Sequence, residues 1–221
     1  MRCLALLSPV DNINAAAALA TSFRIVRWDN LFDDLEGQLE HELRAEEVDL
    51  RAEEERLRLG RLSLRDRLLS LSAGPNATSV SFTLVLASGV TLHVRPVTFG
   101  KDWLAADLVS SADAQCVVPF TWISGVVLTG AQIENSLDPP TESAARVIDR
   151  IGFPFVLRDL CRRRKSVELH TTDGTVTGTI DRVGRDHLDL AVHAPGTLRR
   201  SREVLHYRIV PLAQVQQVRV Y

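Results

Sequence analysis

Two groups of basic side chains near the end of the sequence have the chemistry to bind phosphate. The groups are Arg162, Arg163, Arg164 and Lys165, then Arg199, Arg200 and Arg202, with His206 and Arg208 close behind. Guanidinium groups bind phosphate oxygens through charge and paired hydrogen bonds. Two such groups on one small module predict a face that contacts a nucleic-acid backbone. Few side chains are available to stack on bases, since Tyr207 is the one aromatic residue nearby.

The same basic residues have a purely structural alternative. The first group ends a predicted helix, where the helix dipole stabilises cations without any ligand. The charge distribution does not decide between phosphate binding and this structural role. Residues 145–221 hold 14 bases against 8 acids, whereas residues 28–72 hold 13 acids against 7 bases and residues 73–144 hold 6 acids against 2 bases. This asymmetry predicts an acidic arm and a basic module with different partners, or two regions that attract each other.

The motifs that carry catalysis or hold metals are missing from the sequence. It has no phosphate-binding glycine loop, no H-E-x-x-H, no zinc-ligand spacing and no nucleophile elbow. Cys3, Cys116 and Cys161 are widely spaced, which favours reduced thiols and a cytoplasmic location. Asp102 and Asp186 recur at equivalent turns and either cap these turns or bind a ligand. We expect no enzymatic activity, no cofactor and no metal.

The N-terminal region predicts neither a membrane span nor a compact domain. No apolar run approaches the length of about 18 residues that a span needs. Residues 1–25 imitate a secretory signal only faintly, because Pro9, Asp11 and Asn12 interrupt the apolar stretch. We expect these 25 residues to be disordered, or translation to begin near Val26.

A long acidic helix is expected over residues 26–60. One face carries apolar residues at a spacing of three to four, and these are the candidate contacts for a protein partner: Trp28, Leu31, Phe32, Leu35 and Leu39. Beyond this stripe leucines recur only every seventh residue, while Glu46 or Glu47 and Glu53 or Glu54 take the alternate seam positions. A stable coiled coil needs both seam positions apolar, so this stretch predicts a solvated helix or a weak dimer arm.

The rest of the chain contains one pattern twice. Four landmarks recur in the same order: Leu-Arg-Asp (64–66 and 157–159), a turn glycine (89 and 174), Gly-[Lys/Arg]-Asp-x-Leu (100–104 and 184–188) and Val-Pro (118–119 and 210–211). Such self-similarity indicates a duplicated structural unit.

Each copy is expected to contain a short helix followed by about five antiparallel strands. Hydrophobic residues alternate with period two, and glycines mark the turns. The first module spans residues 61–130, a polar linker spans 131–144, and the second, basic module spans 145–221. The helix of the second module, over 141–164, should be divided near Gly152.

The second copy resembles the Sm-like superfamily, and within it the bacterial RNA-chaperone branch and plainer SH3-like barrels. The resemblance rests on the turn Asp173-Gly174, the bent strand at Gly178, the turn acid Asp186 and the final-strand segment 210–212. His187 stands where the family usually has a base-contacting asparagine. The resemblance implies an α+β, mainly β fold, with two small closed antiparallel barrels in tandem, each preceded by a short helix. It also implies a homo-oligomer that joins barrels edge to edge.

Two functions follow as hypotheses. The first is a non-enzymatic RNA-binding protein that uses the basic second barrel and oligomerises through barrel edges. The alternative is a protein-interaction or assembly scaffold that never contacts nucleic acid, with the apolar stripe of the long helix as its docking face.

Overall fold

The computed structural model describes residues 11–73, 80–111, 114–138, 146–197 and 199–220, with side chains from Asn30 onward. The chain divides into two compact units, residues 1–61 and residues 62–221. We describe each unit separately.

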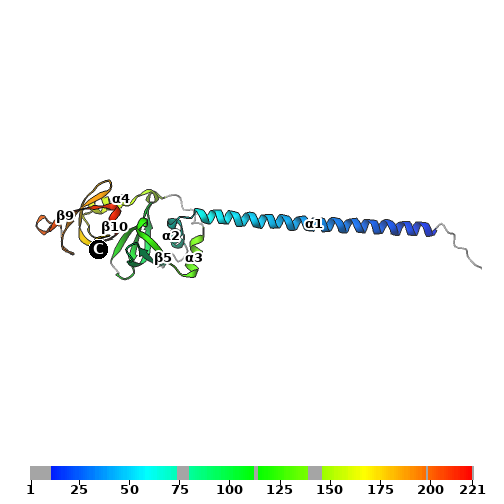
Figure 1. Ribbon diagram of the computed structural model, residues 1–221, viewed down its shortest axis with the longest axis horizontal. Coiled ribbons are helices and arrows are strands. Elements are labelled where there is room, and N and C mark those ends of the chain that lie inside the picture. The colour runs from blue at the N-terminus through cyan, green and yellow to red at the C-terminus, as the bar shows by residue number, and fades with distance from the viewer. Residues whose placement is uncertain (1–10, 74–79, 112–113, 139–145, 198, 221) are drawn as a thin grey trace, which may run out of the picture. The chain divides into compact units, whose positions relative to one another are not determined.

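The first unit is a long helix, as expected, but it begins earlier than the sequence suggested. Helix α1 runs over Asp11–Arg61, 51 residues (Figure 1, blue to cyan). The helix thus includes residues 11–25, which the sequence analysis set apart as a tail, while residues 1–10 lie outside the described part. Ion pairs one turn apart support the exposed helix, including Glu40–Arg44 and Glu47–Arg51, both at 3.2 Å.

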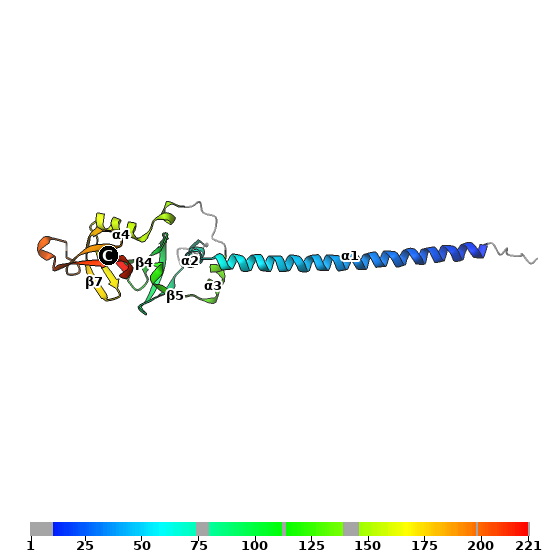
Figure 2. The same ribbon diagram turned by 45° about the horizontal axis from the view of Figure 1, so that its top comes forward.

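The second unit is built on one antiparallel sheet of ten strands. Its strands are β1 (Phe82–Leu86), β2 (Thr91–Phe99), β3 (Trp103–Leu108), β4 (Gln115–Pro119), β5 (Ile123–Val127), β6 (Ser166–Thr171), β7 (Gly174–Val183), β8 (His187–Val192), β9 (His206–Pro211) and β10 (Val215–Val220). The pairing order is β5-β1-β2-β3-β4-β10-β6-β7-β8-β9. We call β1–β5 the first half of the sheet and β6–β10 the second half. Figures 1 and 2 show the two halves next to each other, with β4 and β10 at their junction.

The expectation of two closed barrels is wrong. Strand β4 pairs with β10, the fifth strand of the other half, and not with β5. Within the described residues the sheet ends at β5 and at β9 and stays open. The physical reason is that β10 already satisfies the hydrogen-bonding edge of β4, while β5 and β9 each keep one unpaired edge.

The two halves repeat both strand order and register. Each half follows the order fifth-first-second-third-fourth strand. Even the irregularities coincide, because the β2–β3 ladder shifts between Pro96 and Thr98, and the β7–β8 ladder shifts between Ile180 and Arg182. The landmark turns also repeat one bond: Gly100 N donates to Trp103 O at 2.9 Å, and Gly184 N donates to His187 O at 2.8 Å.

Each half has its own hydrophobic core. The core of the first half is formed by residues of α2 and β1–β4, including Leu68, Leu84, Val94, Leu104 and Val118. The core of the second half is formed by residues of α4 and β6–β10, including Phe153, Leu157, Leu169, Leu190 and Val218. Val117 of β4 and Trp103 of β3 belong to this second core although they lie in the first half.

Short helices precede both halves. Helix α2 (Leu64–Ala73) leads into the first half, and helix α4 (Phe153–Arg162) leads into the second and packs against β7. The predicted division near Gly152 is observed, since the 3-10 turn Val147–Arg150 stands before α4. Residues 141–145 of the predicted helix lie outside the described part.

The segment expected to be a polar linker contains a helix. Helix α3 (Gly130–Leu137) falls largely within residues 131–144 and packs against α2. A capping box explains it, because the side chains of Thr129 and Gln132 each bond the other's backbone N–H. The guanidinium of Arg67 then donates to the buried hydroxyl of Ser136 at 2.8 Å.

Candidate functional site

The junction between the two halves is a strand pair with a buried apolar centre. In β4 and β10, Val117 is opposite Val218 and Cys116 is opposite Arg219. The Val117 side chain is 8% exposed, because it points into the core of the second half. The junction therefore buries side chains from both halves as well as pairing their backbones.

The turn between β2 and β3 adds polar contacts to this junction. The indole N–H of Trp103 donates to the Ile151 carbonyl at 2.8 Å, and the Lys101 N–H donates to the same oxygen at 2.9 Å. The Asp102 carboxylate accepts the Phe153 N–H at 2.8 Å, at the start of α4. Asp102 thus caps the helix of the other half, whereas the sequence analysis considered only a cap on its own turn or a ligand.

A thiol lies buried at the junction. Cys116 is 0% exposed, and burial raises its pKa to about 11, against smaller opposing effects of the Gln217 amide and the Arg219 guanidinium. The thiol is therefore protonated and unreactive near neutral pH. Next to it, Arg219 contacts Glu168 at 3.4 Å, and Glu168 contacts His170 at 2.6 Å.

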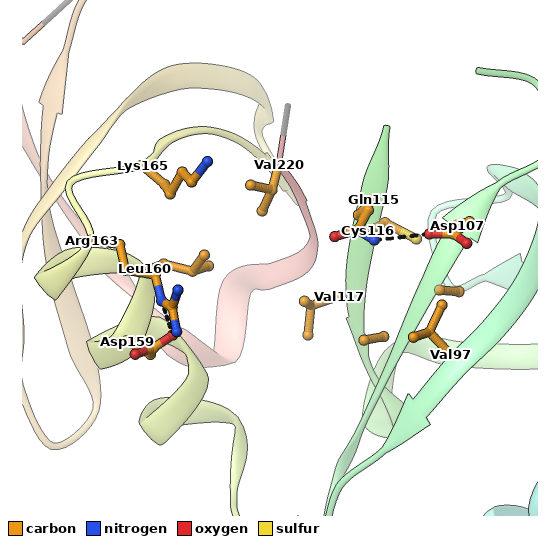
Figure 3. Close-up of a pocket in the computed structure, with 12 residues that line it drawn as sticks. Val97, Asp107, Gln115, Cys116, Val117, Asp159, Leu160, Arg163, Lys165 and Val220 are labelled. Atoms are coloured by element: carbon orange, nitrogen blue, oxygen red, sulfur yellow. Dashed lines mark hydrogen bonds and ion pairs between the residues drawn. The ribbon is translucent and has the colours of Figure 1, made fainter. Parts of the chain in front are cut away.

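A cavity of about 550 Å³ opens beside the junction (Figure 3). Its α4 wall carries Lys165 together with the ion pair Arg163–Asp159, and its β3–β4 wall carries Asp107 bonded to Gln115 at 3.0 Å. The first wall carries two cations and one carboxylate, whereas the second carries the carboxylate of Asp107.

The two outer strands of the sheet repeat the strands of the junction. Alignment on Val-Pro makes β9 the equivalent of β4, and the matching registers make β5 the equivalent of β10. Val117 then corresponds to Ile209, which is 69% exposed. Tyr207 on β9 is 63% exposed and Val127 on β5 is 59% exposed. Each outer strand thus presents apolar side chains beside a hydrogen-bonding edge that no described residue pairs.

Most of the candidate phosphate-binding residues form ion pairs with carboxylates. Arg162 and Arg163 both contact Asp159, at 2.7 and 2.6 Å, and these bonds hold the pKa of that carboxyl below its usual range. Arg164 and Arg199 both contact Asp181, so the structure brings the two basic groups together at this carboxylate.

The remaining basic residues are more scattered. Arg202 contacts the adjacent Glu203 at 3.1 Å, and Arg208 contacts Asp173 at 3.3 Å, at the β6–β7 turn. Lys165, Arg200 and His206 are exposed and form no ion pair with any described residue.

The apolar stripe of α1 is exposed in its own unit. Leu31, Phe32, Leu35 and Leu39 are 45%, 60%, 51% and 57% exposed. The fifth candidate, Trp28, lies on the helix, but its side chain is outside the described part. The described side chains of the stripe are therefore accessible.

Sequence reasoning missed two features of these surfaces. The pairing of Arg162 and Arg163 with Asp159 had a readable signal, because the residues are three and four apart on a helix. The exposure of Ile209 had none, because the strand pattern is the same whether or not another strand covers its edge.

Among the described residues, no group of histidine, cysteine, aspartate or glutamate side chains is arranged to hold a metal ion. No helix in the described part is both long enough and apolar enough to cross a membrane. Comparison with protein-family models, with curated proteins and with solved structures gave no match.

Proposed function

We propose that this chain is a non-catalytic assembly protein, whose copies join head to tail through the open edges of the sheet. The observation that carries the proposal is the internal junction. There, a fourth strand pairs with a fifth strand, β4 with β10. The two strands left at the ends of the sheet are again a fifth strand, β5, and a fourth strand, β9. One chain thus offers both partners of a contact that it already makes internally.

The side chains favour the same contact. Val117 is 8% exposed at the junction, and its equivalent Ile209 is 69% exposed at the free edge. Pairing β9 of one copy with β5 of the next would cover Ile209, as the second half covers Val117. Burial of apolar area is worth about 25 cal/mol per Å², so each such contact favours assembly. A head-to-tail contact closes into a ring or continues as a filament, depending on the rotation between copies.

The two halves fit a finer description as tandem Sm-like modules. This part of the proposal is supported by the repeated strand order, by a short helix before each half and by the resemblance of the second copy. In this description edge pairing substitutes for barrel closure, which explains why the edges of the isolated chain are open.

The test of assembly is the molar mass of the full chain, measured by light scattering over a range of concentrations. The expected result is a mass that rises in steps above the monomer, and a return to monomer in Ile209→Lys. Val147→Lys is the matched control, since Val147 is 81% exposed and lies away from both edges. A monomer at every concentration, or equal masses for the two variants, would contradict the proposal.

RNA binding by the second half is a second candidate function. It is supported by the exposure of cationic side chains that remain accessible: Arg162 is 77% and Arg202 is 74% exposed despite their ion pairs. Lys165 and Arg200 add two cations without a carboxylate partner among the described residues. Exposed pairs of this kind are weak and exchange readily for phosphate.

The RNA test uses fluorescence anisotropy with a single-stranded RNA at two salt concentrations. The variant Arg162→Ala/Lys165→Ala/Arg200→Ala should weaken binding at least tenfold and reduce its salt dependence. It leaves the Arg199–Asp181 pair intact, so the fold is not the cause. The control Arg44→Ala/Arg51→Ala/Arg56→Ala removes three charges from α1. If binding is absent, or equal in both variants, RNA is not the ligand of this surface.

A further inference from the structure

One face of α1 has the pattern of half a coiled coil. Leu43, Leu50 and Leu57 are spaced by seven residues and are 52%, 65% and 52% exposed. Phe32 and Leu39 extend the seam toward the N-terminus. Every described side chain of α1 is exposed, except for the partly buried Arg58. A helix of 51 residues thus carries a row of leucines that stay exposed within the described part of the chain.

Acidic side chains interrupt this seam and flank it. In the heptad set by Leu43 and Leu50, Glu46 and Glu53 occupy the alternate core positions. The flanking positions between residues 40 and 54 are all acidic: Glu40, Glu42, Glu47, Asp49 and Glu54. The side of the helix that a partner would contact is therefore strongly negative.

The helix pairs some of these carboxylates with its own arginines, including the core-position Glu53 with Arg56, and leaves others without an ion pair. Arg44 and Arg51 pair with Glu40 and Glu47 from the outer face. By contrast, Glu42, Glu46, Asp49 and Glu54 form no ion pair with any described residue. A partner that packs on the apolar seam would therefore need basic side chains of its own to neutralise these four carboxylates.

A second copy of α1 cannot supply those groups. In a parallel pair, Glu42 would face Glu47 and Asp49 would face Glu54 of the other helix. In an antiparallel pair, equivalent flanks face each other, and they are acidic from residue 40 to residue 54. Like charges at these positions oppose pairing, so charge disfavours self-association along this face.

We propose that this face of α1 binds a basic amphipathic helix of another protein. The partner would have leucine or isoleucine along its seam, lysine or arginine at its flanks, and long basic side chains opposite Glu46 and Glu53. The apolar seam would supply the buried area, and the opposite charges would set the choice of partner and raise the association rate. This inference does not depend on assembly through the sheet edges.

The test uses the full chain and two labelled helical peptides of about four heptads with the same leucine seam. One peptide has lysine at the flanks and opposite Glu46 and Glu53, and the other has glutamate at those positions. Fluorescence anisotropy should give at least tenfold tighter binding of the basic peptide, and high salt should reduce the difference. Equal binding of both peptides, or binding of neither, would overturn the proposal.

Variants of matched charge sharpen the test. Glu42→Ala/Asp49→Ala raises the net charge by two at the flanks, and Ala45→Lys/Ala52→Lys raises it by the same amount on the outer face. The first variant should weaken binding of the basic peptide about tenfold, and the second less than twofold. Leu50→Asp should abolish binding while circular dichroism still reports the helix. Equal losses of affinity in the two charge variants would mean that net charge alone controls binding. That result would overturn the proposal of a specific binding face.

The assembly variant separates this inference from the proposed function. Ile209→Lys should leave peptide binding unchanged, because it acts at the sheet edge. If the full chain instead forms dimers that Leu50→Asp dissolves and Ile209→Lys does not, α1 pairs with itself and the inference is wrong.

Discussion

The fourth strands of the two halves have the same register but different surroundings. In β4, Val117 is covered by the second half, and Cys116 next to it is fully buried. In β9, the equivalent residues are Ile209, which is 69% exposed, and Arg208, which is ion-paired at the surface. The fourth strand is thus part of the junction in the first half and a free edge in the second half. The proposed assembly through the sheet edges depends on this difference.

The second strands of the two halves differ in a second way. Val94 is fully buried in β2, and its equivalent in β7 is Gly178. A Cβ atom on Gly178 would lie 2.4 Å from the Ala191 carbonyl oxygen. The backbone at this point of β7 and β8 therefore admits only glycine, whereas β2 carries a valine at the equivalent position.

The largest effect is expected from making the second half like the first at this position. Gly178→Val should lower the free energy of unfolding by about 3 kcal/mol, because the backbone must move to admit the side chain. Thermal unfolding is the measurement. Gly125→Ala is the control, since its nearest neighbour is 4.0 Å away, and it should change stability by less than about 1 kcal/mol. An unchanged melting temperature for Gly178→Val would contradict the difference between the strands.

The buried thiol of the joint predicts a dependence on alkaline pH. Burial raises the pKa of Cys116 from 9.0 to about 11, so between these values the unfolded chain loses the proton and the folded chain keeps it. The free energy of unfolding should fall as pH rises across this range, by about 3 kcal/mol in all. Denaturant titrations at several pH values would measure this fall.

Cys116→Ala isolates the thiol from other groups that ionise at high pH. The difference in unfolding free energy between the parent chain and this variant should change with pH from 9 to 11. Parallel profiles would mean that the joint does not bury Cys116 in solution.

A smaller effect on stability distinguishes the junction strand β4 from the free edge strand β9 directly. Val117→Ala should cost about 2 kcal/mol of unfolding free energy at any protein concentration, because it empties a covered site. Ile209→Ala should cost less than about 0.5 kcal/mol in dilute protein, where β9 is exposed, and more in concentrated protein. Denaturant unfolding at two concentrations measures both. A concentration-independent loss for Ile209→Ala would indicate that β9 is never covered.

The smallest effect concerns the arginine of the repeated Leu-Arg-Asp. Arg65 donates to the Gly100 carbonyl at 2.7 Å and to Asp149 at 2.7 Å, whereas among the described residues its equivalent Arg158 donates to the Gly184 carbonyl alone, at 3.3 Å. Arg65→Met should cost about 1.5 kcal/mol, and Arg158→Met about 0.5 kcal/mol. Chemical denaturation of the two variants is the measurement, and equal losses would contradict the asymmetry.

The sequence predicted the elements of this fold better than their connections. The alternation of apolar and polar residues, together with the turn glycines, predicted where the strands lie. This works because successive side chains of a strand point to opposite faces of the sheet, so a two-residue period marks the buried face. Strand β4 pairs with β10 across about 100 residues, and its local pattern would be the same in a closed barrel. Helix α3 was missed because its capping box, Thr129 with Gln132, lies in a polar segment with little hydrophobic periodicity.

The candidate site was predictable in composition and not in geometry. The basic groups were visible as runs of arginine, but Asp181, which joins Arg164 to Arg199, is 17 and 18 residues from them. No local pattern connects residues at such distances. The acidic stripe of α1 was readable, because on a helix the positions of the heptad follow from sequence alone.

The most direct test of edge assembly is disulfide cross-linking between copies at the register of the internal joint. Within one chain, Cys116 is opposite Arg219 and Val117 is opposite Val218. The equivalent contact between two chains would place Arg208 opposite Val127 and Ile209 opposite Val126. In a chain with Cys3→Ser and Cys161→Ser, Val127→Cys/Arg208→Cys should form linked dimers and larger species on mild oxidation, seen on non-reducing gels. Val127→Cys/Ile209→Cys, one residue out of register, should not. Equal cross-linking of both pairs, or none in either, would contradict assembly through β5 and β9.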